Sequence, residues 1–164
     1  MIPVTGFLFH SQTKNKMKTV LDETTRQELV ARINRLNTQS KALWGKMNVA
    51  QMLQHCILAD EMYLGNKTYN RTFLGKLIGK PVLKAILKDD QPMKRNSPTK
   101  KEFKIGHVNT DLEAGKKKWI SLVNEYSNFS NQHFVHWFFG SMTTEQTGYF
   151  VYKHTDHHLR QFGV

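Results

Sequence analysis

Hydrophobic residues recur every three or four positions in several stretches of the chain, which is the spacing of one face of an α-helix. In residues 22–36, Leu29 and Ile33 lie four positions apart, and acidic residues occupy the first turn. A second stretch begins at Asn48, a favourable N-cap residue, and ends at Gly65, a residue suited to a helix C-terminus. These two stretches predict the first two helices.

Two more helices are expected in the C-terminal half. Residues 109–129 place apolar and aromatic side chains at helical intervals, namely Leu112, Trp119, Leu122, Val123 and Tyr126. The aromatic-rich turn HFVHWFFGSM, residues 133–142, follows. The last helix is expected to begin at Thr143, because Thr143 and Gln146 have the spacing of a capping box.

A long basic connection, residues 66–108, joins the second and third of these helices. It contains a shorter helical stretch, residues 73–88, which we expect Pro81 to break or kink. The sequence therefore predicts an all-α fold: a four-helix bundle of antiparallel helices with one long crossover connection and no sheet. We expect this bundle domain over residues 17–164, preceded by an N-terminal extension, residues 1–16.

Length and composition agree with one folded domain. The chain has 164 residues, of which 39% are apolar, including ten Phe, three Trp and five Tyr, so it can bury a continuous core. No apolar run approaches the roughly 18–20 residues that span a bilayer, and the start MIPVTGFLF lacks the features of a signal peptide. We therefore expect a cytoplasmic protein with no membrane partner. The single cysteine, Cys56, excludes an intrachain disulfide, and packing inside a helix is favoured over a catalytic role.

The charge balance raises the question of a polyanionic partner. The 24 Lys and Arg residues against 13 Asp and Glu give a net charge of +11, and phosphate contacts by such residues drive non-specific nucleic-acid binding. The densest basic part, residues 76–104, has few of the interleaved aromatic residues that stack on bases. A solvated basic face is the favoured interpretation, and nucleic acid is not the expected partner.

Three histidines near the C-terminus, His154, His157 and His158, carry the candidate chemistry. They could complement the helix dipole, which favours cations near a helix C-terminus, or they could be solvated residues without a role. Alternatively, His154 and His158 could be a pair of metal ligands, because residues four apart lie on one face of a helix. The segment alone leaves these alternatives open.

The position of the apolar residues favours the metal. At 100° per residue, His154 and His158 continue the stripe of Phe150 and Val151, so they are expected to face inward. His55 also falls on the inner face of its helix. Sites inside helix bundles take ligands from facing helices, and three imidazoles would leave positions open for water or substrate, as in catalytic zinc sites.

Further residues are candidates for the surroundings of this site. Gln51 and Gln161 lie near the expected metal face and could orient a bound water or substrate, although packing explains them equally well. His136, with Trp137 and Phe138, could line the pocket mouth, but an aromatic turn closing one end of the bundle is the more ordinary explanation. Asp156 lies about 180° from the midpoint of the two ligand positions and is expected at the surface, so no carboxylate is assigned as general acid or base.

The segments NVAQMLQHC, HWFFGSMTTEQ and KHTDHHLRQFGV together resemble the DinB superfamily of metalloenzymes, specifically a branch of bacterial proteins. The resemblance covers residues 17–164 and is most specific in the last helix. It implies a four-helix bundle whose metal is held by His55, His154 and His158, and it gives His157 no metal role. The branch often has proline after the turn histidine, where this chain has Trp137 after His136, so the resemblance does not predict the shape of that turn.

The resemblance also implies a metal-dependent enzyme, with a thiol-dependent S-transferase or a related isomerase or hydrolase as the candidate activities. The expected partner is a small-molecule substrate such as a low-molecular-weight thiol. Dimers are common in the family that the chain resembles, so a homodimer is one of the oligomeric states that stay open. The divalent ion could be zinc, nickel or manganese, all of which accept imidazole. The alternatives are a non-catalytic metal-binding bundle protein of the same fold, which uses the ion for stability or ligand sensing, and a basic nucleic-acid-binding protein.

Overall fold

The computed structural model describes residues 17–106, 108, 111–131 and 134–164. The expected N-terminal extension, residues 1–16, lies outside the described residues. The described chain is mostly helical. Its α-helices are α1 (Glu23–Arg35), α2 (Val49–Tyr63), α3 (Phe73–Ile86), α4 (Leu112–Glu125) and α5 (Thr144–Gln161), with short 3₁₀ helices η1 (Lys101–Phe103) and η2 (Tyr126–Asn128). Among them, no helix is long and apolar enough to cross a membrane.

Two helix starts follow from local chemistry that the sequence predicted. At α2, the Asn48 side chain accepts from the Gln51 backbone N–H, and the Gln51 side chain accepts from the Asn48 N–H, both at 2.9 Å. At α5, Thr143 and Gln146 form the same reciprocal pair at 3.1 Å. Each capping box satisfies donors that a helix N-terminus would otherwise leave unpaired, which fixes where the two ligand-bearing helices begin.

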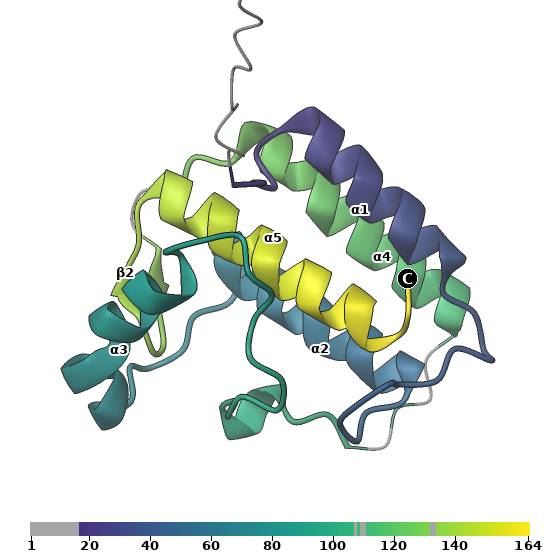
Figure 1. Cartoon of the computed structure of the whole chain (residues 1–164), viewed down its shortest axis with the longest axis horizontal. Coiled ribbons are helices and arrows are strands. Elements are labelled where there is room, and N and C mark those ends of the chain that lie inside the picture. Colours follow the sequence, from purple (N-terminus) through teal and green to yellow (C-terminus); the bar gives the residue numbers. More distant parts are fainter. Residues whose placement is uncertain (1–16, 107, 109–110, 132–133) are drawn as a thin grey trace, which may run out of the picture.

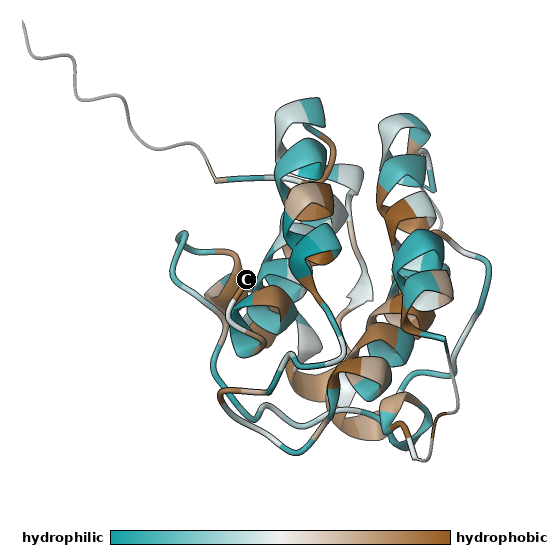
Figure 2. Ribbon diagram, turned by 90° about the vertical axis from the view of Figure 1, so that its right-hand side faces the viewer, coloured by the Kyte–Doolittle hydropathy of each residue, from teal (hydrophilic) through white to brown (hydrophobic). Residues whose placement is uncertain are grey.

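Four of the helices pack against one another. Helix α4 packs against α1 and α2, and α5 packs against the same two helices. Figure 1 shows α1 beside α4 and α5 across α2, with α3 to one side near β2. In Figure 2 hydrophobic and hydrophilic residues alternate along the helices, as expected for helices that bury one side. The core between them includes Leu29, Met52, Trp119, Leu122 and Leu159, all essentially inaccessible to solvent.

A small sheet contradicts the prediction of a fold without strands. Strand β1 (Val135–His136) pairs antiparallel with β2 (Gly140–Ser141), and His136 lies opposite Gly140. Gly140 has a φ of +78°, which glycine adopts without steric cost. Strands of two residues are too short to produce a recognisable alternation of polar and apolar positions, which is why the pattern did not reveal them.

The sequence predicts that Pro81 breaks or kinks the helical stretch of α3. The break is wrong, because α3 continues through Pro81 to Ile86, and the kink stays a prediction. Proline removes the hydrogen bond to the carbonyl four residues earlier, that of Leu77. Leu77 lies on the exposed side of α3, where water reaches the helix. The helix therefore tolerates the loss there.

Two carboxylates are buried between helices. Asp156, expected at the surface, is instead buried and contacts Arg32 of α1 at 2.8 Å and Arg160 at 2.7 Å. The single-helix projection failed because α1 covers the side of α5 that faces away from the histidines. Asp60 of α2 accepts hydrogen bonds from the Trp119 indole and the Tyr126 hydroxyl, both at 2.8 Å, and burial raises its pKa to about 7.

Cys56 is free and buried, which confirms the interpretation of this residue as part of the apolar core. It lies one turn before Asp60 on α2, and burial raises the pKa of its thiol well above the usual value. The thiolate, which is the reactive form of cysteine, is therefore disfavoured at this position.

Candidate metal centre

Helices α2 and α5 bring three histidines from distant parts of the chain together. His55 lies on α2 and is buried, as its position on the inner stripe predicted. His154 and His158 lie one turn apart on α5, with His158 buried and His154 partly buried. The capped start of α5 and the buried side chains of Phe150 and Val151 keep this face against α2.

The three rings are close enough to hold one metal ion. One ligand nitrogen from each histidine lies within 4.8 Å of the other two, and the Nε2 atoms of His55 and His154 are 3.3 Å apart. The ring centroid of His158 lies 4.7 Å from that of His55 and 4.8 Å from that of His154. Two nitrogens bound to zinc at about 2.0–2.1 Å with a tetrahedral angle are themselves about 3.3 Å apart, so the His55–His154 pair already has the spacing of two ligands of such an ion.

The backbone carbonyl of Phe103 orients the His55 ring. His55 Nδ1 lies 2.9 Å from this oxygen. Because a carbonyl only accepts, Nδ1 carries the proton and Nε2 presents a lone pair toward the other histidines. Phe103 belongs to η1 and is buried, so the crossover connection supplies the group that selects this tautomer. Backbone carbonyls carry no sequence signature, and sequence reasoning missed this contact.

Gln161 performs the same task for His158. Its Oε1 lies 3.0 Å from His158 Nδ1, and its Nε2 donates to the Trp44 carbonyl at 2.7 Å. Since the Trp44 carbonyl can only accept, the amide orientation is fixed, and His158 Nδ1 must donate to Oε1. His158 Nε2 is therefore also a free acceptor. The sequence placed Gln161 near the metal face, but not its role as a bridge to Trp44.

Gly45 leaves room for this bridge. A Cβ atom at Gly45 would lie 2.6 Å from Gln161 Nε2, closer than real side chains approach, and the φ of Gly45 is +82°. Glycine is the residue that combines this backbone conformation with the absence of a side chain. The loop before α2 is thus shaped to receive Gln161 from the end of α5.

Burial keeps the three imidazoles neutral. It lowers the pKa of His158 to about 3, and it lowers the pKa of His154 well below the usual 6.5. The pKa of His55 is also lowered by burial, which outweighs the opposing effect of the Phe103 carbonyl. The neighbouring histidines lower the values of His154 and His158 further, because like charges would repel. Neutral imidazole is the form that binds metals.

Two other predicted site residues have their polar groups engaged elsewhere. The Gln51 side chain caps α2 and donates to the carbonyls of Ile105 and Gly106, at 3.3 and 2.8 Å. His136 is buried in the hairpin, where its Nδ1 accepts from the backbone N–H groups of Phe138 and Phe139 at 3.1 and 3.2 Å. Burial lowers the pKa of His136 to about 3. These contacts place Gln51 at a helix start and His136 at a turn, and neither side chain hydrogen-bonds to the three clustered histidines among the described residues.

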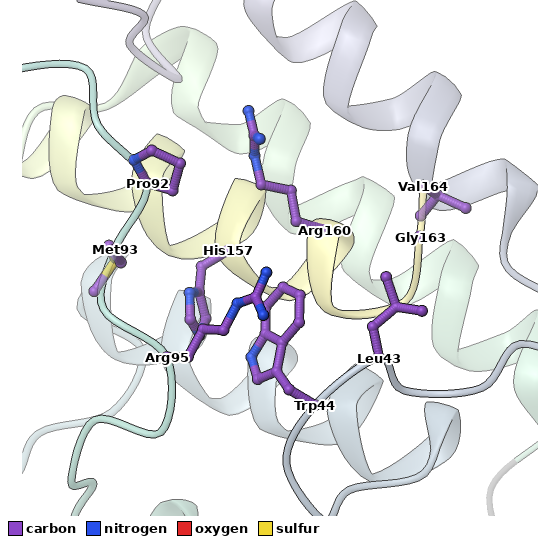
Figure 3. A pocket seen from close by; sticks show the side chains of 9 residues that line it. All are labelled: Leu43, Trp44, Pro92, Met93, Arg95, His157, Arg160, Gly163 and Val164. Carbon is purple, nitrogen blue, oxygen red and sulfur yellow. The ribbon is translucent and has the colours of Figure 1, made fainter.

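A cavity of about 340 Å³ adjoins the cluster on the side of His157. Figure 3 shows its lining, which includes Leu43, Trp44, Pro92, Met93, Arg95, His157 and Arg160. The His157 ring packs edge-on against both His158 and Trp44, with centroids 5.1 and 5.6 Å away. The Arg95 guanidinium lies 4.2 Å from the Trp44 ring centroid. His157 therefore separates the clustered histidines from a cavity that contains cationic groups.

The donor set determines what this arrangement can do chemically. Three neutral nitrogen ligands are suited to a divalent transition metal, and they would leave it an undiminished positive charge. Within the part of the chain that the structure describes, no carboxylate or thiol joins the set. A site with three protein ligands is typical of metal centres that also bind water or substrate.

Comparison with known proteins identifies the family of the chain but adds no activity. The model of the family described as "Protein of unknown function (DUF1569)" matches residues 15–163. No curated protein and no solved structure matches the chain. The match extends over nearly the whole length and includes all three clustered histidines, so the chain belongs to the DUF1569 family.

Proposed function

We propose that this protein is a metal-dependent enzyme whose divalent cation is bound by His55, His154 and His158. The convergence of one nitrogen from each of these residues within 4.8 Å carries the proposal. The four helices that pack in pairs support a four-helix bundle of the DinB type, in which ligands project inward from facing helices. The resemblance of the second and last helices to that superfamily points in the same direction.

The residues around the site hold the ligands ready for binding. The Phe103 carbonyl and the Gln161 amide oxygen each accept a hydrogen bond from the Nδ1–H of a proposed ligand, which leaves the Nε2 lone pairs of His55 and His158 free to bind a metal. Outer contacts of this kind fix the ring orientation and raise the basicity of the ligand. A bound divalent ion would supply Lewis acidity, lowering the pKa of a thiol or water so that a nucleophile is available at neutral pH.

The reaction that fits best is thiol-dependent group transfer, or a related isomerisation or hydrolysis. Arg95 and Arg160 line the adjoining cavity, where they would attract a thiol or electrophile that bears carboxylates. Arg160 already pairs with Asp156, whereas Arg95 lies over Trp44 and makes no ion pair among the described residues. Arg95 is thus the better candidate for contacting an anionic substrate. Zinc, nickel and manganese all accept this ligand set.

Elemental analysis of purified protein tests the ion. We expect about one divalent metal per chain in the wild type, as one three-ligand site requires, and its loss in His154→Ala and His158→Ala. His157→Ala is the matched control, because His157 lies on the same helix and next to a ligand but outside the cluster. It should keep the metal. Equal metal content in the wild type and in His158→Ala would refute the proposal.

A non-catalytic metal-binding protein is the second candidate. It is favoured by the absence, among the described residues, of a carboxylate in the cluster that could act as general acid or base. Turnover and thermal unfolding of the ligand variants discriminate between the two. If the ion is structural, the ligand variants should melt at a lower temperature than the wild type, and the wild type should have no turnover. If the ion is catalytic, the ligand variants should stay folded but should no longer convert a thiol and an electrophile.

A further inference from the structure

Helix α3 packs in an unusual orientation, with its smallest residues inward. Gly75 and Gly79 are buried against the hairpin. A Cβ atom at Gly75 would lie 2.6 Å from the Phe138 carbonyl oxygen, and one at Gly79 would lie 2.1 Å from the same atom. The helix and the hairpin backbone therefore approach more closely than any residue with a side chain would allow.

Polar contacts from the flanks hold α3 in this orientation. The Thr72 N–H donates to the Trp137 carbonyl at 3.0 Å. The Arg71 guanidinium donates to the Phe138 carbonyl of the hairpin at 3.5 Å and to the Gly75 carbonyl of α3 at 2.8 Å, so it links the two. The Lys80 ammonium group donates to the Ser141 carbonyl. Because these contacts join α3 to the hairpin before the helix begins and again at its middle, the helix cannot rotate to bury a different face without breaking them.

As a result, the large apolar residues of α3 face solvent. The exposed fraction is 78% for Phe73, 55% for Leu74, 63% for Leu77 and 41% for Ile78. Residues 73 and 77 lie one turn apart, as do residues 74 and 78, so the four side chains form one contiguous patch. We call these four residues the α3 apolar face. Contiguous apolar patches on a protein surface mark sites of association with a protein or a membrane.

A row of lysines borders this face. Lys76, Lys80 and Lys84 are exposed and follow one another at intervals of four residues, and no acidic residue occurs from residue 73 to residue 88. Among the described residues, none of the three makes an ion pair with a carboxylate, as the ion pairs found elsewhere involve other lysines. The lysine row therefore gives the border of the α3 apolar face an uncompensated positive charge.

We propose that α3 docks this protein onto the surface of a bilayer that contains anionic phospholipid. Helices that lie in the membrane interface have one apolar face with Phe or Leu and a polar side rich in lysine. The apolar side chains would enter the boundary between headgroups and acyl chains, and Lys76 and Lys84 would contact the lipid phosphates, since Lys80 is hydrogen-bonded to the hairpin. Such binding needs no spanning helix. It therefore departs from the expectation of no membrane partner, which rested on the lack of an apolar run long enough to span a bilayer. It is also independent of the metal centre, since the histidine cluster contributes no residue to it.

The shape and charge of this surface favour a bilayer over a second copy of the chain. Figure 1 shows α3 at the side of the molecule, next to β2 and beyond the four packed helices. A projecting helix suits a flat surface, whereas a helix-binding protein would have to provide a groove. Two copies meeting through this face would bring their lysine rows together, and each chain has a net charge of +11.

Vesicle sedimentation with the full chain tests the proposal. Vesicles with roughly a third phosphatidylglycerol should bind the wild type about tenfold more tightly than vesicles of phosphatidylcholine alone, and added salt should weaken the binding. The double variant Phe73→Gln with Leu77→Gln should bind about tenfold more weakly, because it removes much of the inserted apolar area. Lys76→Glu with Lys84→Glu should bind at least as weakly and should also lose the salt dependence.

Two control variants match these changes elsewhere on the surface. Leu43 is 69% exposed, and Lys117 is exposed on α4. Leu43→Gln and Lys117→Glu should therefore stay within about twofold of the wild type. All variants change exposed side chains, so circular dichroism should show unchanged helix content.

Several results would overturn the proposal. Specific docking through α3 would be excluded if the wild type did not bind vesicles, or if it bound both kinds of vesicle equally. It would also be excluded if the control variants reduced binding as much as the α3 variants. Analytical ultracentrifugation gives a further check. A wild-type dimer that becomes a monomer in the Phe73→Gln, Leu77→Gln variant would show that a second copy covers the face. A wild-type protein that is monomeric and does not bind vesicles would indicate that an acidic protein, and not a bilayer, covers the α3 apolar face.

Discussion

The substitution Gln161→Leu tests whether the contacts around the histidines prepare them for a metal. Gln161 is 4% exposed and joins the buried His158 ring to the backbone carbonyl of the half-buried Trp44. Leucine is one bond shorter and apolar, so it provides neither the acceptor for His158 Nδ1 nor the donor for the Trp44 carbonyl. The variant therefore removes one outer contact of a proposed ligand while leaving all three ligands in place.

The structure allows the size of the effect to be estimated. Losing an outer-shell partner of a histidine ligand typically weakens metal binding by about 10- to 100-fold, which corresponds to about 1.4–2.7 kcal/mol. In the metal-free protein, leaving the buried His158 Nδ1–H unpaired should lower the free energy of unfolding by about 1–3 kcal/mol. Gly45→Ala should act in the same direction, because its Cβ would lie 2.6 Å from Gln161 Nε2.

Competition with a coloured chelator measures the metal affinity, and urea unfolding in the presence of a strong chelator measures the stability of the metal-free protein. Gln161→Glu separates the two contacts, because a carboxylate still accepts from His158 but cannot donate to Trp44. Gln27→Leu, on the exposed side of α1, is the matched control. If Gln161→Leu bound metal as tightly as the wild type, the idea that this amide prepares the site would be wrong.

Two further predictions concern the hairpin. The metal-free protein should lose stability as the pH falls from 6.5 toward 3, because unfolded His136 takes up a proton near its ordinary pKa of 6.5 and folded His136 only near 3. Between pH 7 and pH 5 this residue accounts for about 2 kcal/mol, so urea unfolding of His136→Gln should show a correspondingly smaller loss, and an unchanged loss would exclude this assignment. Gly79→Ala should lower the free energy of unfolding by about 1–3 kcal/mol, because its Cβ would overlap the Phe138 carbonyl. Gly106→Ala, where a Cβ would meet no atom of the described chain within 4 Å, should change it by less than about 0.5 kcal/mol, and equal effects of the two would contradict the packing argument.

The surroundings of the candidate site show where prediction from sequence ends. Gln161 and Gln51 were both placed near the metal face from their helical positions, yet only Gln161 hydrogen-bonds to a clustered histidine. The difference arises from the loops. Trp44 turns the Gln161 amide toward His158, whereas the carbonyls of Ile105 and Gly106 engage the amide of Gln51. The path of an irregular segment cannot be read from periodicity, because its backbone partners depend on contacts distant in sequence.

The sequence by itself determined the helices of the core, their capped starts and the inward face of each histidine, because helix periodicity and capping act over three or four residues. Only the tertiary structure decided what those faces meet. The local sequence does not indicate that α1 covers Asp156, or that Phe103 orients His55 from 48 residues away. The orientation of α3 is the clearest case. Apolar residues normally turn inward, but the close approach of Gly79 to the hairpin leaves Phe73 and Leu77 in solvent.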